Sequence, residues 1–188
     1  MKTTNEPTDK ELVAASSKGD MRAFEKLVKR LEPRVAATVI SMLGNSPEVD
    51  DVGQETFVRF YKALDQYRGD SSVASYVTRI AMNLSLNELK RRKRWFGLFS
   101  ADDSDLVQAA GAGGNSEATY DDRELVRMAL QQLTPEYRAV VVLRIMEGYS
   151  TEETANILKI PVGTVTSRLA RGQAKLKDIV NVLIGETP

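Results

Sequence analysis

The sequence contains neither cysteine nor histidine among its 188 residues. Without cysteine, neither a disulfide framework nor a thiolate metal site can form. Without histidine, the chain also lacks the commonest general base and the commonest transition-metal ligand. No run of about 18 apolar residues occurs, and the N-terminus has no apolar core of signal-peptide length. We therefore expect a cytoplasmic protein that is not inserted in a membrane and holds no cofactor and no metal.

The chain also lacks a net charge, since 26 basic residues balance 26 acidic ones. Taken alone, this balance argues against nucleic-acid binding, but the charges are unevenly distributed. Residues 79–94 carry six cations and one carboxylate, and residues 100–122 carry six carboxylates and no cation. Partners respond to such local fields rather than to the total charge.

The acidic segment around "GAGG" has no amphipathic period and is typical of a flexible, self-repelling linker. It divides the chain into a domain over 1–97, a linker over 98–122 and a domain over 123–188. Apolar residues in both blocks recur at helical spacing, and no segment alternates as a strand does. The sequence predicts an all-α protein of two small helical domains joined by a flexible acidic linker.

Local signals place several helix boundaries. "TDKE" (8–11) and "STEE" (150–153) are capping boxes that begin helices. Ser46 is expected to cap a further helix, with Pro47 at its first position. Pro33 lies within another amphipathic run and is expected to kink or interrupt that helix.

Residues 151–176 show the pattern of a helix-turn-helix. Ala155 is small enough for two helices to cross closely, and Ile160 and Val165 supply apolar side chains at and after the turn. Lys159 stands where such turns often have glycine.

The second helix of this unit has two distinct sides on a helical wheel. One side is apolar and expected to be buried; it comprises Val162, Val165, Leu169, Gly172 and Leu176. The neighbouring side is polar and cationic; it comprises Thr164, Arg168, Arg171 and Lys175. Arginine can bond guanine bidentately, and lysine mostly meets phosphate. For a basic helix considered alone, a solvated charged face is the favoured interpretation. The preceding capped helix and turn favour DNA binding instead.

These motifs resemble the sigma-70 family of bacterial RNA polymerase sigma factors, in its extracytoplasmic-function (ECF) group. Residues 133–176, "LTPEYRAVVVLRIMEGYSTEETANILKIPVGTVTSRLARGQAKL", resemble region four. Residues 50–64, "DDVGQETFVRFYKAL", resemble region 2.2, and residues 67–94 resemble regions 2.3 and 2.4. The resemblance implies a promoter-specificity subunit whose partners are core RNA polymerase and promoter DNA, with no small-molecule substrate.

The resemblance assigns core polymerase binding to a polar face of region 2.2, made of Asp51, Gln54, Glu55 and Arg59. It assigns recognition of the minus-10 element to a loop that pockets a flipped base and to the helix that follows it. The matching residues are Tyr67, Arg68, Gly69, Asp70, Ser71, Tyr76, Arg79, Asn83, Lys90, Arg91, Arg92 and Lys93. Solvated helix faces remain the alternative interpretation of both surfaces.

Two aromatic positions in this part carry further expectations. Tyr76 stands where the family usually has tryptophan, which leaves a smaller aromatic face. Trp95, Phe96 and Phe99 follow the basic cluster and either form a docking patch or cap the domain core; we favour the core.

The resemblance assigns the minus-35 element to the second helix of the helix-turn-helix. The residues implied are Gly163, Thr164, Thr166, Ser167, Arg168, Arg171 and Lys175. Thr166 stands where lysine or arginine is common, and Gly172-Gln173 stands where Ala-Arg is common, so we expect weaker phosphate anchoring. The family further implies an anti-sigma protein that covers both domains, and an acidic linker that occupies a polymerase channel.

Two other classes of function stay open at this point. A free-standing helix-turn-helix regulator would explain residues 150–176 but leave residues 50–94 without a role. An enzyme would need a catalytic group, yet the carboxylate pairs Asp50/Asp51 and Asp102/Asp103 have no base or nucleophile beside them in the predicted elements.

Overall fold

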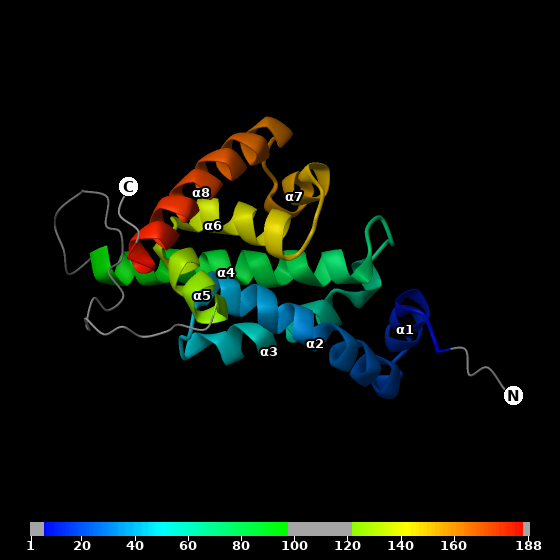
Figure 1. The fold of residues 1–188 in the computed structure, drawn as a ribbon. Helices are drawn as coiled ribbons and strands as arrows, with labels where there is room; N and C mark the ends of the chain where they lie inside the picture. Colours follow the sequence, from blue (N-terminus) through cyan, green and yellow to red (C-terminus); the bar gives the residue numbers. More distant parts are fainter. Residues whose placement is uncertain (1–5, 98–121, 186–188) are drawn as a thin grey trace, which may run out of the picture.

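The computed structural model describes residues 6–97 and 122–185, and all regular elements within these ranges are helical. The first group comprises α1 (Asp9–Ser16), α2 (Met21–Leu43), α3 (Glu48–Lys62) and α4 (Val73–Gly97). The second comprises α5 (Asp122–Gln132), α6 (Pro135–Val141), α7 (Thr151–Leu158) and α8 (Val162–Leu183) (Figure 1). The all-α prediction with two helical domains is confirmed, whereas the predicted linker, up to residue 121, lies outside the described residues.

Both predicted capping boxes are present. The Thr8 backbone N–H donates to Glu11 at 2.7 Å, and the Glu11 N–H donates to the Thr8 hydroxyl at 3.3 Å. The equivalent distances between Ser150 and Glu153 are 2.8 and 3.1 Å. Each box satisfies two backbone donors that a helix N-terminus otherwise leaves unpaired.

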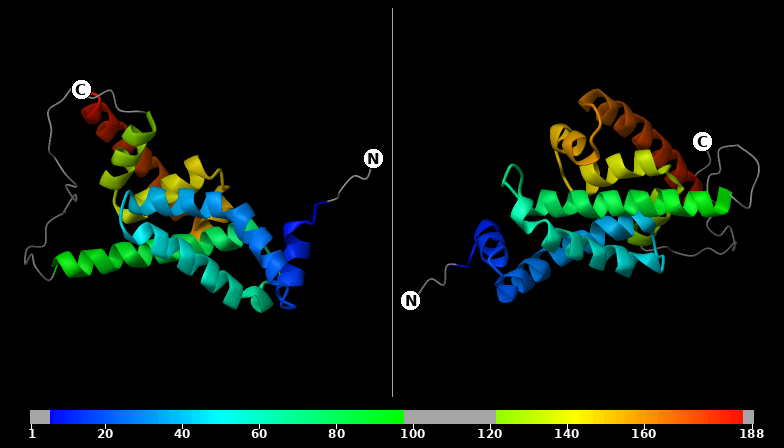
Figure 2. Two further views of the ribbon diagram at one scale, coloured as in Figure 1. Left: turned by 90° about the horizontal axis from the view of Figure 1, so that it is seen from below. Right: turned by 180° about the vertical axis from the view of Figure 1, so that it is seen from behind.

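Two predicted boundaries differ in detail. α2 continues through Pro33 as one helix, and its axis bends along its length (Figure 2). The bend is expected, because proline removes one backbone donor, while the packing of α2 against α1, α3 and α4 keeps the helix continuous. α3 begins at Glu48, so Pro47 takes the cap position and Ser46 makes no side-chain cap bond.

The sequence interpretation placed no helix over 122–132, where the structure has α5. Its buried residues are few, Ala129 and Leu130, and the turn after it buries Leu133. A helix of three turns with so short an apolar stripe gives a weak periodic signal, because most of its stability comes from what it packs against.

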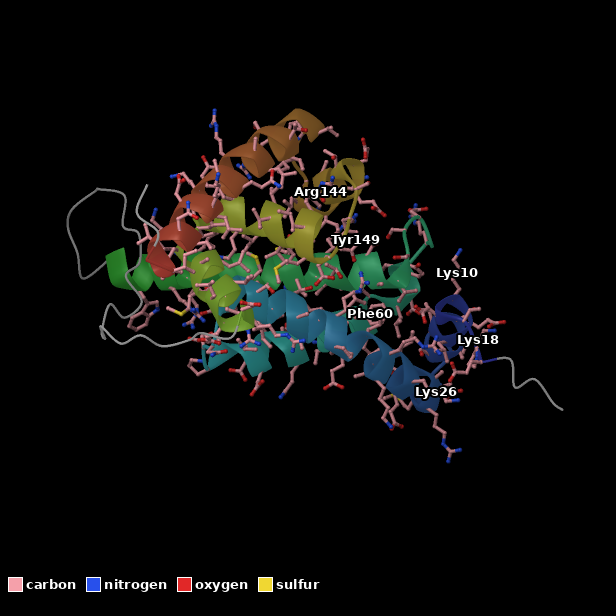
Figure 3. The ribbon with its side chains drawn as sticks, in the orientation of Figure 1. Lys10, Lys18, Lys26, Phe60, Arg144 and Tyr149 are labelled. Atoms are coloured by element: carbon pink, nitrogen blue, oxygen red, sulfur yellow. The ribbon has the colours of Figure 1, made fainter. Side chains whose placement is uncertain are left out.

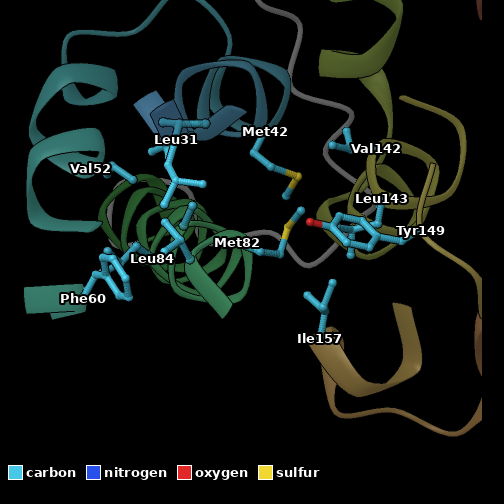
Figure 4. Packing of buried hydrophobic residues seen from close by; sticks show 14 of the residues in the cluster. Leu31, Met42, Val52, Phe60, Met82, Leu84, Val142, Leu143, Tyr149 and Ile157 are labelled. Carbon is cyan, nitrogen blue, oxygen red and sulfur yellow. The ribbon is translucent and has the colours of Figure 1, made fainter. Parts of the chain in front are cut away.

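The two groups of helices share one hydrophobic core. α6 and α7 lie along one side of α4, while α2 and α3 lie along another (Figures 1 and 2). Met42 and Met82 from the first group extend towards Val142, Leu143 and Tyr149 from the second (Figure 4). All five side chains are buried, so packing between the domains adds to the packing within each.

Two absences can be stated for residues 6–97 and 122–185. No helix there combines the length and the apolar character needed to cross a bilayer. Nor do three or more acidic side chains gather there as a metal site would require.

Candidate nucleic-acid interface

α7 and α8 form the predicted helix-turn-helix around a small core of their own. Val165 of α8 and Val140 of α6 are fully buried and pack with Ala155 of α7. The chain turns between the helices at Lys159, which has φ 54° and ψ 47°. The Ile160 N–H donates to the Ala155 carbonyl at 3.1 Å and closes the turn. The left-handed conformation explains why this position often carries glycine.

Replacing Lys159 with glycine is expected to raise the free energy of unfolding by roughly 0.5–1 kcal/mol, because a left-handed residue with a Cβ is strained. The greater freedom of glycine in the unfolded chain offsets part of the gain. Urea denaturation of the variant beside Lys159→Ala separates the backbone effect from loss of the lysine side chain. Equal stabilities of the two variants would contradict the strain.

α8 presents its predicted polar side to solvent. Gly163, Thr166, Ser167, Arg171 and Lys175 are exposed, and Thr164 and Arg168 are half-buried. Within the described residues, none of the three cations Arg168, Arg171 and Lys175 forms an ion pair, although Lys175 lies 6.0 Å from the centre of the Tyr137 ring. The face therefore holds cationic side chains that carboxylates have not neutralised.

Two residues of the predicted buried stripe of α8 behave differently from one another. Val162 is exposed, which corrects its assignment to the buried side, because it lies at the first turn beyond the core. Gly172 is buried where α8 crosses α6, and a Cβ there would approach the Val141 side chain to 3.0 Å. The small size of Gly172 thus suits the close packing of α8 on α6. The weaker phosphate anchoring expected from Thr166 and Gly172-Gln173 stays a prediction.

The residues of α4 that pack neither on α2 and α3 nor on α6 and α7 form a polar stripe. Asn83 and Lys90 are exposed on it, and Arg79 is half-buried. Sequence interpretation missed Asn87, which is exposed one turn beyond Asn83 and lines a shallow hollow with Lys90, Lys93 and Arg94. The spacing of four residues between the two asparagines was the signal available for it.

The basic cluster divides into free and paired cations. Arg91 donates to Glu88 at 2.8 Å, and Arg92 donates to Glu48 at 2.7 Å and to Ser46 at 2.5 Å. Hydrogen bonds from Arg91 hold the pKa of Glu88 below its usual value, so this carboxylate stays ionised. Arg92 thus joins the end of α4 to the start of α3, and Arg91 also lies 3.6 Å from Glu48. Of the five consecutive cations from Lys90 to Arg94 that the resemblance places near phosphate, Lys90, Lys93 and Arg94 remain without such partners in the described part of the chain.

The loop between α3 and α4 is closed on itself. The Tyr67 hydroxyl donates to the Ser71 carbonyl at 2.5 Å, and Gly69 has φ +79°. Arg68 and Asp70 are exposed at its tip. A shallow hollow separates this loop from α1, lined by residues that include Tyr67, Arg68, Gly69, Lys10 and Ser17. Lys10 projects from α1 and is labelled in Figure 3.

The two aromatic expectations have different outcomes. Tyr76 is half-buried, with its ring 6.2 Å from Phe60 and 5.3 Å from Tyr67, so it also serves the core. Trp95 is 62% exposed, so the preference for a core position is wrong for this residue. The side chains of Phe96 and Phe99 lie outside the described part of the structure. α4 runs beyond the helices that cover its first part, so no core reaches residue 95 (Figure 2).

α3 carries the predicted polar face. Asp51, Gln54 and Arg59 are exposed, and Arg59 donates to Glu55 at 2.7 Å. Phe60 faces the opposite way and is fully buried. The buried side of α3 therefore holds the helix in place, and its polar side is exposed, as a binding surface requires.

Comparisons with known proteins agree with this arrangement. The family model described as "Sigma-70 region 2" matches residues 27–95, and the one described as "Sigma-70, region 4" matches residues 123–176. The ECF RNA polymerase sigma-E factor of Escherichia coli K12 is 35% identical over 188 residues, which is 94% of this chain and 96% of that protein. The RNA polymerase sigma-H factor of Pseudomonas aeruginosa is 32% identical, covering 95% and 96%.

Solved structures show the same fold. CnrH in complex with the cytosolic domain of CnrY superposes with a TM-score of 0.68 at 29% identity, over 93% of this chain and 97% of that one. The sigma factor RpoE of Bartonella quintana, in complex with the anti-sigma factor NepR, gives 0.66 at 21% identity over 85% and 97%. From the two family matches and from relatives that align over nearly the whole chain, this protein belongs to the sigma-70 family of RNA polymerase sigma factors, in the ECF group.

Proposed function

We propose that this sigma factor binds core RNA polymerase through the exposed face of α3 and directs it to promoters that α4 and α8 read. The observation that carries the proposal is the pair of exposed cationic helix faces on two separate domains, together with a polar face on α3 that includes the carboxylates of Asp51 and Glu55. A promoter-specificity subunit needs these three surfaces together, since phosphate contacts position a protein and base contacts give specificity.

Each surface receives a defined part of this work. On α8, Arg168 and Arg171 can reach base edges of the minus-35 element, while Lys175 suits phosphate. On α4, Asn83 and the newly identified Asn87 suit base edges of the minus-10 element, and Lys90 and Lys93 suit its phosphates. The loop over 67–71 remains the proposed pocket for a flipped base. Arg91 and Arg92 act mainly by fixing α4 to α3.

We further propose that an anti-sigma protein controls this chain. The support is CnrH, the 29% identical relative that was solved with the cytosolic domain of a second protein. The factor would work in the cytoplasm, where core polymerase and promoters are. In this proposal it contributes recognition and no catalytic group, and the domains divide as 1–97 and 123–188.

Transcription in vitro with purified core polymerase tests the proposal. Core enzyme plus this protein should start transcripts at defined sites in genomic DNA, and core enzyme alone should not. The free-standing regulator predicts the reverse: no new start sites, and a footprint on duplex DNA by the protein alone.

Replacing Arg171 with alanine is expected to weaken binding of the holoenzyme to a minus-35 promoter by about 5- to 150-fold, since a good bidentate base contact is worth roughly 1–3 kcal/mol. Lys177→Ala is the matched control, because Lys177 is an exposed cation of α8 outside the predicted face. Binding is measured at one fixed salt concentration. Equal affinities for the two variants would remove Arg171 from the reading face.

A further inference from the structure

The five consecutive cations at the end of α4 do not all face the same way. One shallow hollow is lined by Asn87, Lys90, Lys93 and Arg94. Among the described residues, Arg91 and Arg92 do not line it. Successive residues of a helix are turned by about 100°, so these two arginines follow Lys90 around the helix. They leave the side that carries the polar stripe and turn towards α3.

Arg91 is held by a bidentate pair with Glu88. Its Nε and one of its Nη atoms donate to the two oxygens of that carboxylate, each at 2.8 Å. Two parallel bonds of this kind are the strong form of an arginine–carboxylate pair. The Glu88 side chain is only 12% exposed. If Arg91 moved to a phosphate, it would leave a carboxylate that water reaches poorly, which is costly.

Arg92 is held by three acceptors on two elements. It donates to Ser46 at 2.5 Å, to Glu48 at 2.7 Å and to Glu88 at 3.3 Å. Its side chain is 20% exposed. The backbone N–H of Glu48 lowers the pKa of its own carboxyl group, so this acceptor is also ionised at neutral pH. Two guanidinium groups and two carboxylates thus form one neutral network between α3 and α4.

This network changes the balance between the two kinds of DNA contact. Each cation that meets a phosphate adds an attraction that is the same for every sequence. Selectivity is the ratio of the affinity for a promoter to the affinity for other duplex DNA. Keeping Arg91 and Arg92 on carboxylates therefore weakens the attraction to all duplexes, and it leaves the base-reading positions Asn83 and Asn87 unchanged.

We propose that Glu48 and Glu88 are specificity-determining residues, which hold Arg91 and Arg92 against α3 and so keep two of the five cations away from DNA phosphates. Removing the two carboxylate charges should strengthen binding to DNA of any sequence, whereas a merely structural role predicts weaker binding. The inference rests on the proposed function for its effect on promoter choice. The number of phosphates that the chain contacts on an arbitrary duplex does not depend on that function.

The salt dependence of binding to a duplex without promoter elements counts these phosphate contacts in the full chain. Fluorescence anisotropy of the labelled duplex gives the slope of log affinity against log salt, to which each contact contributes about 0.9. Glu48→Gln with Glu88→Gln should steepen the slope by about 0.9 to 1.8, which is a further loss of about 3- to 12-fold between 50 and 200 mM salt. An unchanged slope in this variant overturns the proposal.

The matched control makes the same change in net charge at two other carboxylates. Glu32→Gln with Asp50→Asn alters exposed residues that have no ion pair within residues 6–97 and 122–185. Asp50 also lies in the first turn of α3, as Glu48 does. The slope of this control should equal that of the unmodified chain. A control slope as steep as that of the glutamate variant overturns the proposal, because net charge alone would then explain the effect.

Replacing the cations gives an independent test. Arg91→Gln with Arg92→Gln should leave the slope unchanged, whereas Lys90→Gln with Lys93→Gln should reduce it by about 1.8. The arginine replacements, added to Glu48→Gln and Glu88→Gln, should return the slope to that of the unmodified chain. An arginine variant that loses as much slope as the lysine variant overturns the proposal. Circular dichroism checks that each variant is folded, and the glutamate variant decides alone if the arginine variant is not.

Transcription with core polymerase tests the consequence for promoter choice. Duplex DNA without a promoter, added as competitor, should inhibit holoenzyme carrying Glu48→Gln and Glu88→Gln at a concentration at least about threefold lower than it inhibits the unmodified holoenzyme. Equal sensitivity to the competitor overturns the role in selectivity. If the unmodified holoenzyme starts no transcripts, the proposed function is refuted instead, and the salt slope of the glutamate variant still decides whether the two carboxylates keep the arginines from DNA.

Discussion

Replacing Arg138 with methionine is expected to lower the free energy of unfolding by about 2–4 kcal/mol. Arg138 is 5% exposed, and its guanidinium donates to the carbonyls of Met42, Gln131 and Leu133 and to the Gln131 side chain. Methionine fills similar space without a donor, so these buried acceptors lose their partner. Burial lowers the pKa of Arg138 to about 10, which leaves it charged at neutral pH.

Two effects oppose each other in this variant. Removing Arg138 relieves the cost of burying a charge, which is why the expected loss is smaller than four separate hydrogen bonds would give. The orphaned carbonyls lie at the ends of α2 and α5, where no backbone donor can replace the guanidinium. The cost of leaving these carbonyls unpaired therefore exceeds the gain from no longer burying a charge.

Urea denaturation followed by circular dichroism measures the effect. Arg127→Met on α5 is the matched control, because Arg127 is partly exposed and, among the residues that the structure describes, pairs with Glu124 alone at 3.2 Å. Such a surface pair contributes at most about 1 kcal/mol. If both variants lose less than about 1 kcal/mol, Arg138 does not hold the domains as the geometry implies.

Reversing charge at Asp51 and Glu55 together, to lysine, is expected to weaken binding to core polymerase by at least about tenfold, because like charges facing each other across an interface cost several kcal/mol. Both residues lie on the outer face of α3, and within residues 6–97 and 122–185 Glu55 pairs with Arg59 alone. Losing that pair, and placing a cation near the start of α3, should cost the fold about 1–2 kcal/mol.

Affinity chromatography or gel filtration of the complex measures the binding. Glu32→Lys, at an exposed position of α2, controls for the change in net charge. Asp51→Asn with Glu55→Gln should give an intermediate loss, because it removes attraction without adding repulsion. Binding that matches the control for the reversed variant would move the polymerase contact away from α3.

Local signals in the sequence predicted much of the candidate site. The capping box over 150–153 and the spacing of Val165 and Arg171 each lie within one or two helical turns, so a short stretch of residues is enough to reveal them. The sequence could not distinguish Lys90, which is unpaired among described residues, from Arg92, which binds Glu48. That difference depends on a partner more than 40 residues away.

Gly172 and Trp95 also show that the sequence alone could not predict what surrounds a residue. The stripe predicted a buried Gly172 correctly, but its meaning came from Val141 of a neighbouring helix. The apolar character of Trp95 favoured a core position, yet α4 extends past its neighbours and leaves the ring exposed. Burial at the end of a helix depends on which elements reach it.

By itself, the sequence determined the helical class, the two domains, the helix-turn-helix and the family, because these follow from periodicity and motifs within short stretches. Only the tertiary structure decided how the domains pack, which cations are free, and what Arg138 and Glu147 contact. Thr38 and Glu147 are 109 residues apart, and Met42 and Arg138 are 96 apart. Contacts over such separations leave no local pattern, since the neighbours of a residue in sequence do not reveal a partner that lies about 100 residues away.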